Sequence, residues 1–336
     1  MYKTIILCLG VPASLLLILS INTTLGIILL LFIVFTIAFF ALEASTCKLD
    51  DKTLAKVIQG IDKNFDTKKI LSKKLESDHV TEYYETTTNR DYRILEWFEG
   101  PGMHSKLTVR HPINAHSGLT VQPSLVMREI AASHAQSVLE VGSGKGFCTF
   151  YLANLLPDVR FTGLDLVHKH IEISTVECSR GNYKNVRFVN GDARDPTSFK
   201  TVYDIIFSVE ALCHLDSENK MRDFLENTKN YLHNRGKLVI VDGFRSPDFN
   251  TSSENQQLAM MLAERGFQIK QMPSKADWIL LASEYGLEVQ RDVDLTEEVL
   301  PFWRLGWRVA RFLLHFMPLT RFFHFSLWQL LSHDLN

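Results

Sequence analysis

The stretch Val138-Leu-Glu-Val-Gly-Ser-Gly-Lys-Gly146 decides the fold of this chain. It begins inside a short apolar run, Ser137 to Val141, that is typical of a buried strand, and its three glycines directly precede an apolar segment that begins near Phe147. Glycine adopts positive φ without steric cost and lets a ligand approach the backbone closely. We therefore expect a strand, a tight loop that contacts a small molecule, and a helix.

Short apolar runs of the same kind continue along the chain, with amphipathic stretches between them. This alternation predicts an α/β domain with a largely parallel sheet and flanking helices. Ligands of such sheets bind at the carboxyl ends of the strands, so the informative residues should stand there. The runs that we expect to form strands are Ser137–Val141, Arg160–Leu166, Val186–Val189, Tyr203–Val209 and Lys237–Val241.

Acidic residues stand at the ends of the first three runs. Glu140 lies in the first, Asp165 follows 25 residues later in the second, and Asp192 comes just after the third, in Gly191-Asp192-Ala193. A carboxylate at the end of the second strand is suited to accept both ribose hydroxyls of a nucleoside. Either Asp would serve equally well as a helix N-cap, and a glycine-rich turn is often only a turn. Their order and spacing together predict a nucleoside pocket.

The glycine spacing distinguishes between two classes of nucleoside ligand. A dinucleotide loop reads G-x-G-x-x-G, whereas here the glycines fall as G-x-G-x-G and Phe147 occupies the third glycine position of that fingerprint. Glu140, two residues before the first glycine, is unhelpful near a pyrophosphate and useful near an amino-acid ammonium group. The residues therefore favour S-adenosylmethionine over a nicotinamide dinucleotide.

These motifs resemble those of class I S-adenosylmethionine-dependent methyltransferases, over roughly residues 80–301. The resemblance implies a Rossmann-like methyltransferase sheet, S-adenosylmethionine as cofactor and methyl transfer as the activity. It places Glu140 and the glycine loop at the methionine end of the cofactor, Asp165 at the ribose, and Asp192 with Ala193 at the adenine. The cofactor-binding residues that it implies are Glu140, Gly142, Ser143, Gly144, Gly146, Asp165, Leu166, Asp192 and Ala193.

A finer resemblance, to sterol C-methyltransferases and tocopherol methyltransferases, lies in three segments. These are Tyr83-Tyr84-Glu85 with Tyr92, Trp97 and Met103-His104; Ser208-Val-Glu-Ala-Leu-Cys-His214; and Lys275-Ala-Asp-Trp-Ile279 through Val299-Leu-Pro-Phe-Trp303. The sequence departs from the family at Glu99-Gly-Pro-Gly102 and after His104. The resemblance implies a lipid substrate.

Three residues are the expected catalytic groups: Tyr84, Glu210 and His214. If the methyl acceptor is an alkene carbon, a carbocation forms, which the face of Tyr84 and the carboxylate of Glu210 would stabilise. A base must then remove a proton, and Glu210 or His214 stands at a strand end where it could do so. With a phenol or an amine as acceptor, the same two residues could deprotonate or orient it. Each also has a structural interpretation, as a loop histidine, a backbone-binding carboxylate or a packing aromatic.

The first 45 residues are nearly uncharged and predict a membrane anchor. Two apolar runs, Ile5 to Ile21 and Leu25 to Leu42, are separated by Asn22-Thr23-Thr24, which fits a transmembrane helical hairpin of two short spans. Lysines flank the pair on both sides, so the remaining domain should lie on the cytosolic face. A single-pass or re-entrant helix and a cleaved signal peptide are the alternatives.

Two segments flank the methyltransferase-like residues 81–300. Residues 46–80 carry apolar positions at helical spacing and predict an amphipathic linker helix. Residues 301–336 place Arg304, Arg308 and Arg311 beside tryptophans and an apolar tail, as in a helix at a membrane surface. The same segment could instead cover the catalytic domain as a lid.

The composition of the chain argues against several other classes of function. With 36 Lys+Arg against 38 Asp+Glu, the chain has no overall field that attracts nucleic acid, so none is expected as a partner. Five scattered cysteines favour a reducing compartment over a disulfide framework. No metal site is expected, and we interpret His168 and His170 as surface histidines rather than zinc ligands. A homo-oligomer is possible but nothing indicates one.

The sequence thus predicts a membrane-anchored methyltransferase that acts on a lipophilic small molecule, first a sterol or polyprenoid methylated on carbon. A prenylated phenol, a quinone precursor or a small amine is the alternative acceptor. Alternatives from other classes are a non-catalytic membrane scaffold that retains the fold and a nicotinamide-dependent oxidoreductase.

Overall fold

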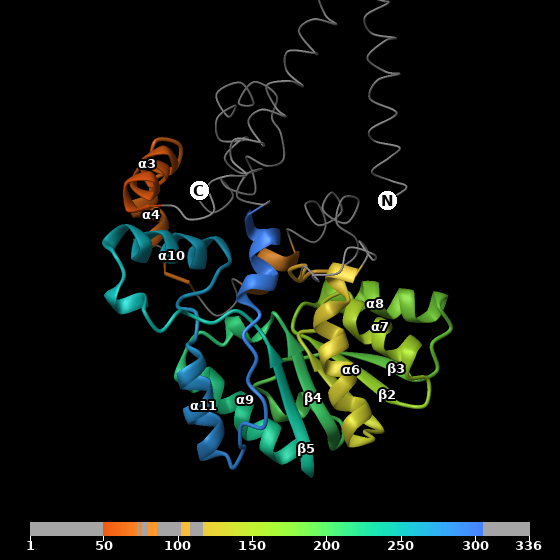
Figure 1. The fold of residues 1–336 in the computed structure, drawn as a ribbon. Coiled ribbons are helices and arrows are strands. Elements are labelled where there is room, and N and C mark those ends of the chain that lie inside the picture. Colours follow the sequence, from red (N-terminus) through yellow and green to blue (C-terminus); the bar gives the residue numbers. More distant parts are fainter. Residues whose placement is uncertain (1–49, 73, 76–79, 86–101, 108–116, 305–336) are drawn as a thin grey trace, which may run out of the picture.

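The computed structural model describes residues 50–72, 74–75, 80–85, 102–107 and 117–304. The predicted α/β fold is confirmed: five strands form one sheet in the order β3-β2-β1-β4-β5, and each neighbouring pair is parallel (Figure 1). The strands are β1 (Ser137–Val141), β2 (Arg160–Asp165), β3 (Val186–Asn190), β4 (Tyr203–Val209) and β5 (Leu232–Val241).

Helices cover both faces of the sheet because successive strand residues point to opposite faces. Val138 and Ile205 pack toward one layer, and their neighbours Leu139 and Ile206 pack toward the other. Two helices bury side chains in the first layer, α6 (Val121–Ser133) and α7 (Phe147–Leu155), and two in the second, α9 (Glu218–Tyr231) and α11 (Lys275–Glu284). Helix α8 (His168–Arg180) packs on β2 and β3. A fully buried side chain such as that of Phe224 contributes about 1.5–3 kcal/mol to stability.

The last strand is longer than the sequence suggested. β5 begins at Leu232 rather than at Lys237. Leu232 pairs with Tyr203 of β4, and a register shift follows. The residues at 233–235 are exposed and polar, so they gave no apolar signal. They lie in the register shift between two positions that pair with β4, Leu232 and Lys237, so it is their place between these pairs and not burial that puts them in the strand.

The amphipathic residues that follow the apolar N-terminal runs form two helices, α3 (Asp51–Asp62) and α4 (Thr67–Ser72). Asp50 caps α3 by accepting a hydrogen bond from the amide of Thr53 at 2.7 Å. Both helices pack against α10 (Glu254–Gly266), whose Asn255 side chain donates to Asp51 at 2.8 Å. In Figure 1 these three helices gather at one end of the molecule.

No helix in the described part of the chain is both long and apolar enough to cross a bilayer. The apolar runs at residues 5–21 and 25–42, which predicted the hairpin, lie outside the described residues, as does the tail beyond residue 304. Both membrane interpretations therefore stay predictions.

The strand order reverses between β1 and β4. From β1 the chain moves outward through β2 to β3 and then returns to place β4 on the other side of β1. In parallel sheets this switch point opens a crevice at the carboxyl ends of the strands. The residues that follow β1, β2 and β4 are therefore brought to one place.

Candidate active site

The loop after β1 requires its glycines. Gly142, Gly144 and Gly146 all have positive φ, at 73°, 52° and 87°. A Cβ atom on Gly142 would lie 2.2 Å from the Cβ of Ala211, so the turn after β4 packs directly on this glycine. The amides of Gly142 and Ser143 donate to the carbonyl of Leu164 at 2.8 and 3.0 Å, which fixes the loop to the end of β2.

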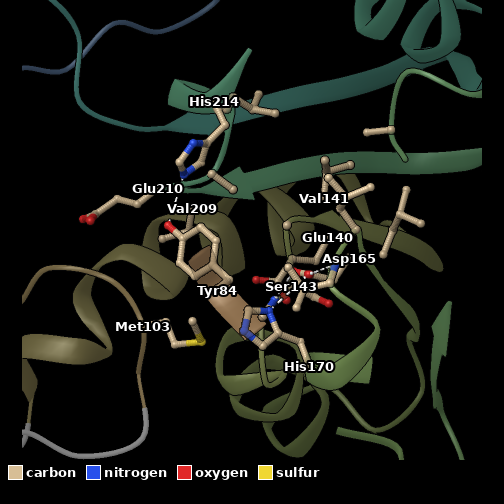
Figure 2. Close-up of a pocket in the computed structure, with 18 of the residues that line it drawn as sticks. Tyr84, Met103, Glu140, Val141, Ser143, Asp165, His170, Val209, Glu210 and His214 are labelled. Atoms are coloured by element: carbon tan, nitrogen blue, oxygen red, sulfur yellow. Dashed lines mark hydrogen bonds and ion pairs between the residues drawn. The ribbon is translucent and has the colours of Figure 1, made fainter. Parts of the chain in front are cut away.

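A pocket opens beside this loop, and it contains nearly all the residues that the sequence singled out (Figure 2). Gly146 is the exception: it precedes α7 in a left-handed conformation and packs on Phe150 and Phe188 instead of lining the pocket. Its contact with the cofactor stays a prediction. The predicted residues that do line the pocket are Tyr84, Glu140, Gly142, Ser143, Gly144, Asp165, Leu166, Asp192, Ala193, Glu210 and His214.

Glu140 is a buried acid, with 3% of its surface exposed. Its carboxylate accepts a hydrogen bond from the Thr149 hydroxyl. Burial raises the pKa of Glu140 to about 8, because desolvation disfavours the charged form. A cation placed next to this carboxylate would favour its ionised form, so the residue is suited to an ammonium group.

Asp165 ends β2 and organises the loop around it. One carboxylate oxygen accepts from the amide of Gly144 at 2.7 Å, and the other accepts from the amide of Val167 at 2.9 Å and lies 3.2 Å from Nδ1 of His170. The side chain lies in the pocket, where a ribose could reach it.

His170 corrects one prediction. It is only 2% exposed and lines the pocket, whereas His168 is exposed as expected. Residues two positions apart on a helix are separated by about 200° around its axis, so the two histidines of H-x-H point in nearly opposite directions. His170 is turned inward, where it meets Asp165 at the end of the preceding strand and makes an edge contact with the Tyr84 ring, with centroids 5.8 Å apart.

Asp192 carries a partner that the sequence analysis missed. The Arg194 guanidinium donates from Nε to both oxygens of Asp192 at 3.0 Å. Burial would raise the pKa of Asp192, but these bonds outweigh it and hold that pKa below its ordinary value. The next residue, Ala193, is fixed by a 3.0 Å bond from Asn227 of α9 to its carbonyl. The spacing D-x-R is a local signal that could have identified the pair.

On the other side of the pocket, Tyr84 meets His214. The Tyr84 hydroxyl lies 3.1 Å from Nε2 of His214, and the two rings make an edge contact with centroids 5.5 Å apart (Figure 2). Burial lowers the pKa of His214 to about 4, so the imidazole is neutral at pH 7. Its Nδ1 is buried with no hydrogen-bond partner among the described residues. The amide of Cys213 donates to Asp242 at 3.1 Å and holds this turn against the end of β5.

Glu210 also reaches the pocket, but its carboxylate points away from the Tyr84–His214 pair in Figure 2. Its oxygens accept from the amide of Ser105, from the Ser105 hydroxyl and from the Gln122 side chain. Ser105 and Gln122 are buried polar residues that sequence reasoning missed, because nothing in their neighbourhood along the chain marks them.

Met103 and His104 complete the wall beside the glycine loop. Nε2 of His104 donates to the carbonyl of Leu119 at 2.8 Å, and its ring packs on Phe147 with centroids 5.5 Å apart. Burial lowers the pKa of His104. The ring of Tyr83 lies against that of Tyr84, with centroids 5.0 Å apart. Tyr92 and Trp97 lie outside the described residues.

The residues of the pocket fit the ligand that the sequence implied. Glycines at Gly142 and Gly144 let a ligand approach the backbone, and the Ser143 hydroxyl is buried without a hydrogen-bond partner in the described structure. Glu140 is matched to an ammonium group and Asp165 to a diol. In the part of the chain that the structure describes, no cluster of His, Cys, Asp and Glu is arranged to hold a metal ion.

Comparison with known proteins also indicates a methyltransferase. A family model described as a methyltransferase domain matches residues 132–284. The malonyl-[acyl-carrier protein] O-methyltransferase of Bacillus anthracis is 29% identical over 38% of this chain and 41% of its own length. The release factor glutamine methyltransferase of Aliivibrio fischeri is 30% identical over 41% of this chain and 55% of its own. The chain thus spans about half the length of these relatives, or less.

Solved structures share the fold at low sequence identity. A geranyl diphosphate methyltransferase in complex with GPP and sinefungin superposes with a TM-score of 0.58 at 17% identity, over 68% of this chain and 87% of that one. The geranyl diphosphate C-methyltransferase of Streptomyces coelicolor reaches 0.56 at 16% identity, over 70% and 89%. The [4+2]-cyclase SpnF reaches 0.53 at 14% identity, over 70% and 81%. Since these names include different reactions, the fold does not identify the reaction or its substrate.

Proposed function

Because residues 132–284 form a class I S-adenosylmethionine-dependent methyltransferase domain, we propose that the whole chain is a membrane-associated methyltransferase that acts on a lipophilic small molecule. The preferred acceptor is a sterol or another polyprenoid-like molecule methylated on carbon. A prenylated phenol or quinone precursor is the second candidate, because a base beside a hydroxyl would serve that chemistry as well.

The cofactor of the domain is S-adenosylmethionine, which supplies a methyl group on a sulfonium sulfur when it is bound. We call Glu140, residues 142–145, Asp165 and Asp192 the cofactor half of the pocket. Glu140 holds the ammonium group of the cofactor and Asp165 its ribose hydroxyls. The protein's main contribution to such a displacement is to hold donor and acceptor in line and to exclude water.

The observation that carries the proposal is the contact between Tyr84 and His214. With Met103 and His104, these residues form what we call the acceptor half. In the tautomer protonated at Nδ1, His214 accepts the Tyr84 proton at Nε2 while the Tyr84 oxygen takes a proton from the methylated acceptor. His214 becomes an imidazolium and the acceptor loses its positive charge. A neutral imidazole at pH 7 is the form that this step requires.

The lipophilic acceptor is supported by several separate features. The segments that resemble sterol and tocopherol enzymes include both Tyr84 and His214. Apolar side chains line much of the pocket, among them Val80, Met103 and Phe147. A C-methyltransferase of geranyl diphosphate is a precedent for carbon methylation on this fold. The apolar N-terminal runs and their flanking lysines favour a membrane location with the domain on the cytosolic face.

The proposal is tested by incubating the full-length protein in detergent with methyl-labelled S-adenosylmethionine and a total lipid extract from its source. We expect label in the organic phase, and loss of that label in Asp165→Ala. Asp158→Ala removes an exposed acid elsewhere on the domain and should keep the activity. No label in the organic phase, with cofactor binding intact and demethylated cofactor still formed, would contradict a lipophilic acceptor. No label in the organic phase and no demethylated cofactor, with cofactor binding intact, would contradict methyl transfer and favour a scaffold.

A further inference from the structure

Most of the acceptor capacity of the Glu210 carboxylate is already used by the protein. The amide of Ser105 donates to both oxygens at 3.0 Å, and the Ser105 hydroxyl donates to Oε2 at 2.9 Å. The Gln122 side-chain amide donates to Oε1 at 2.6 Å. Ser105 is 4% exposed and Gln122 only 1%, so these contacts are shielded from water. These three donor groups occupy most of the about four acceptor sites of the carboxylate, and they hold it on the side away from Tyr84 and His214 (Figure 2).

These contacts determine where residues 102–107 lie. Gln122 also donates to the carbonyl of Ser105 at 2.9 Å, so both polar groups of the Ser105 backbone are held. The two residues before Ser105 reach the glycine loop: the Met103 sulfur would lie 3.1 Å from a Cβ on Gly144, and His104 packs on Phe147. Pinning Ser105 therefore places the wall of the pocket against the cofactor half.

The backbone conformation at Glu210 also directs its side chain toward Ser105. Its φ of 50° is left-handed, which is costly for a residue that is not glycine. The amide of Glu210 donates to Val241 at 2.8 Å, and Ala211 packs on Gly142. The turn after β4 is thus fixed from β5 and from the glycine loop, and it aims the Glu210 side chain at Ser105 rather than at His214.

We propose that Glu210 is a positioning residue, which fastens residues 102–107 as a wall of the pocket, and that it is not the base that takes a proton from the acceptor. The inference rests on the proposed function, because it divides the acids and bases of the same pocket between two roles. Proton removal is left to Tyr84 and His214.

The first experiment compares the wild type with Glu210→Gln and Glu210→Ala, each as the full-length chain in detergent. Calorimetry gives the affinity for S-adenosylmethionine, and the lipid-extract assay at a fixed amount of extract gives an apparent kcat and the KM for S-adenosylmethionine at several pH values. Glutamine keeps an oxygen that accepts from Ser105, whereas alanine removes the anchor. We expect glutamine to keep affinity and kcat within about 10-fold, and alanine to weaken affinity by about 10- to 100-fold with an unaltered pH profile.

The opposite pattern would overturn the proposal. A general base contributes about 10²- to 10⁴-fold to the rate, and glutamine cannot replace it. If Glu210→Gln loses kcat by that factor, or loses a limb of the pH profile, while the cofactor affinity stays unchanged, Glu210 is the base.

Gln122→Met tests the contact from the other side, since it removes the donor to Glu210 and keeps the side-chain length. We expect a weaker cofactor affinity, and little further loss when Gln122→Met is combined with Glu210→Ala, because the two residues act on the same segment. Independent, additive losses would contradict a shared anchor.

Glu210→Gly separates the effect of losing the side chain from the effect of backbone strain, because glycine adopts the left-handed φ without strain. It should lose affinity as much as alanine does, and unchanged affinity in both variants overturns the anchor. If the wild type transfers no methyl group, the proposed function fails, but calorimetry still decides whether Glu210 is the anchor.

Discussion

In the cofactor half of the pocket, each side chain comes from the end of a strand or the loop that follows it, whereas the acceptor half draws on segments that are far apart in the chain. Glu140, Asp165 and Asp192 lie at or near the carboxyl ends of three neighbouring strands of one sheet. Tyr84 meets His214 across 130 residues, and Ser105 meets Glu210 across 105. The difference teaches that sheet topology turns motifs directly into a ligand site, whereas in a site made by packing the motifs name residues but do not show which of them meet.

The largest effect is expected in the acceptor half. His214→Leu removes the group that accepts the Tyr84 proton, so kcat for methyl transfer should fall by about 10²- to 10⁴-fold. Cofactor affinity measured by calorimetry should change little. A variant that loses cofactor affinity but keeps kcat would show that the two halves are not separate.

Gly142→Ala should weaken cofactor binding by about 100-fold or more. A Cβ there collides with Ala211 and has to adopt positive φ, so the loop must shift. Gly286→Ala is the matched control, since Gly286 also has positive φ, at 78°, but has nothing within 4 Å of the added atom. Similar binding losses in both variants would mean that backbone strain, and not the close approach of the turn after β4, is responsible.

Cofactor affinity should rise with pH up to about 8. The pKa of Glu140 is raised by burial, so below pH 8 a proton must leave this carboxyl before it can hold an ammonium group. Affinity should therefore fall by about tenfold per pH unit from pH 8 to pH 6. Calorimetry over this range, in buffers of different ionisation enthalpy, measures both the slope and the released proton. In Glu140→Gln the slope should vanish, and a slope that persists would assign it to another group.

The smallest effect is expected at the rim of the cofactor half. Arg194→Met removes the ion pair to Asp192, and the two side chains are about 30% exposed. Exposed pairs contribute about 0.2–1 kcal/mol, so we expect cofactor affinity to fall by less than 10-fold. A loss as large as that of Gly142→Ala would mean that Arg194 contacts the ligand directly.

Most of the fold could be predicted from the sequence, because a buried parallel strand is a short apolar run that can be recognised without knowing which distant residues it will contact. The misjudged start of β5 shows the limit of that signal, since residues 233–235 are polar and belong to the strand only because Leu232 before them pairs with β4. Gly146 shows another limit: the loop motif identified a required glycine, but only packing on Phe150 and Phe188 reveals that it does not line the pocket.

The sequence alone determined the residue types at the strand ends, because spacing along the chain translates directly into positions along one edge of a parallel sheet. It therefore identified Glu140, Asp165 and Asp192, together with the class of cofactor. Only the tertiary structure decided which groups face each other: that His170 turns inward to Asp165, and that Glu210 is held by Ser105 and Gln122 while His214 meets Tyr84. Such contacts depend on burial and on the direction of each side chain, which are properties of the packed chain.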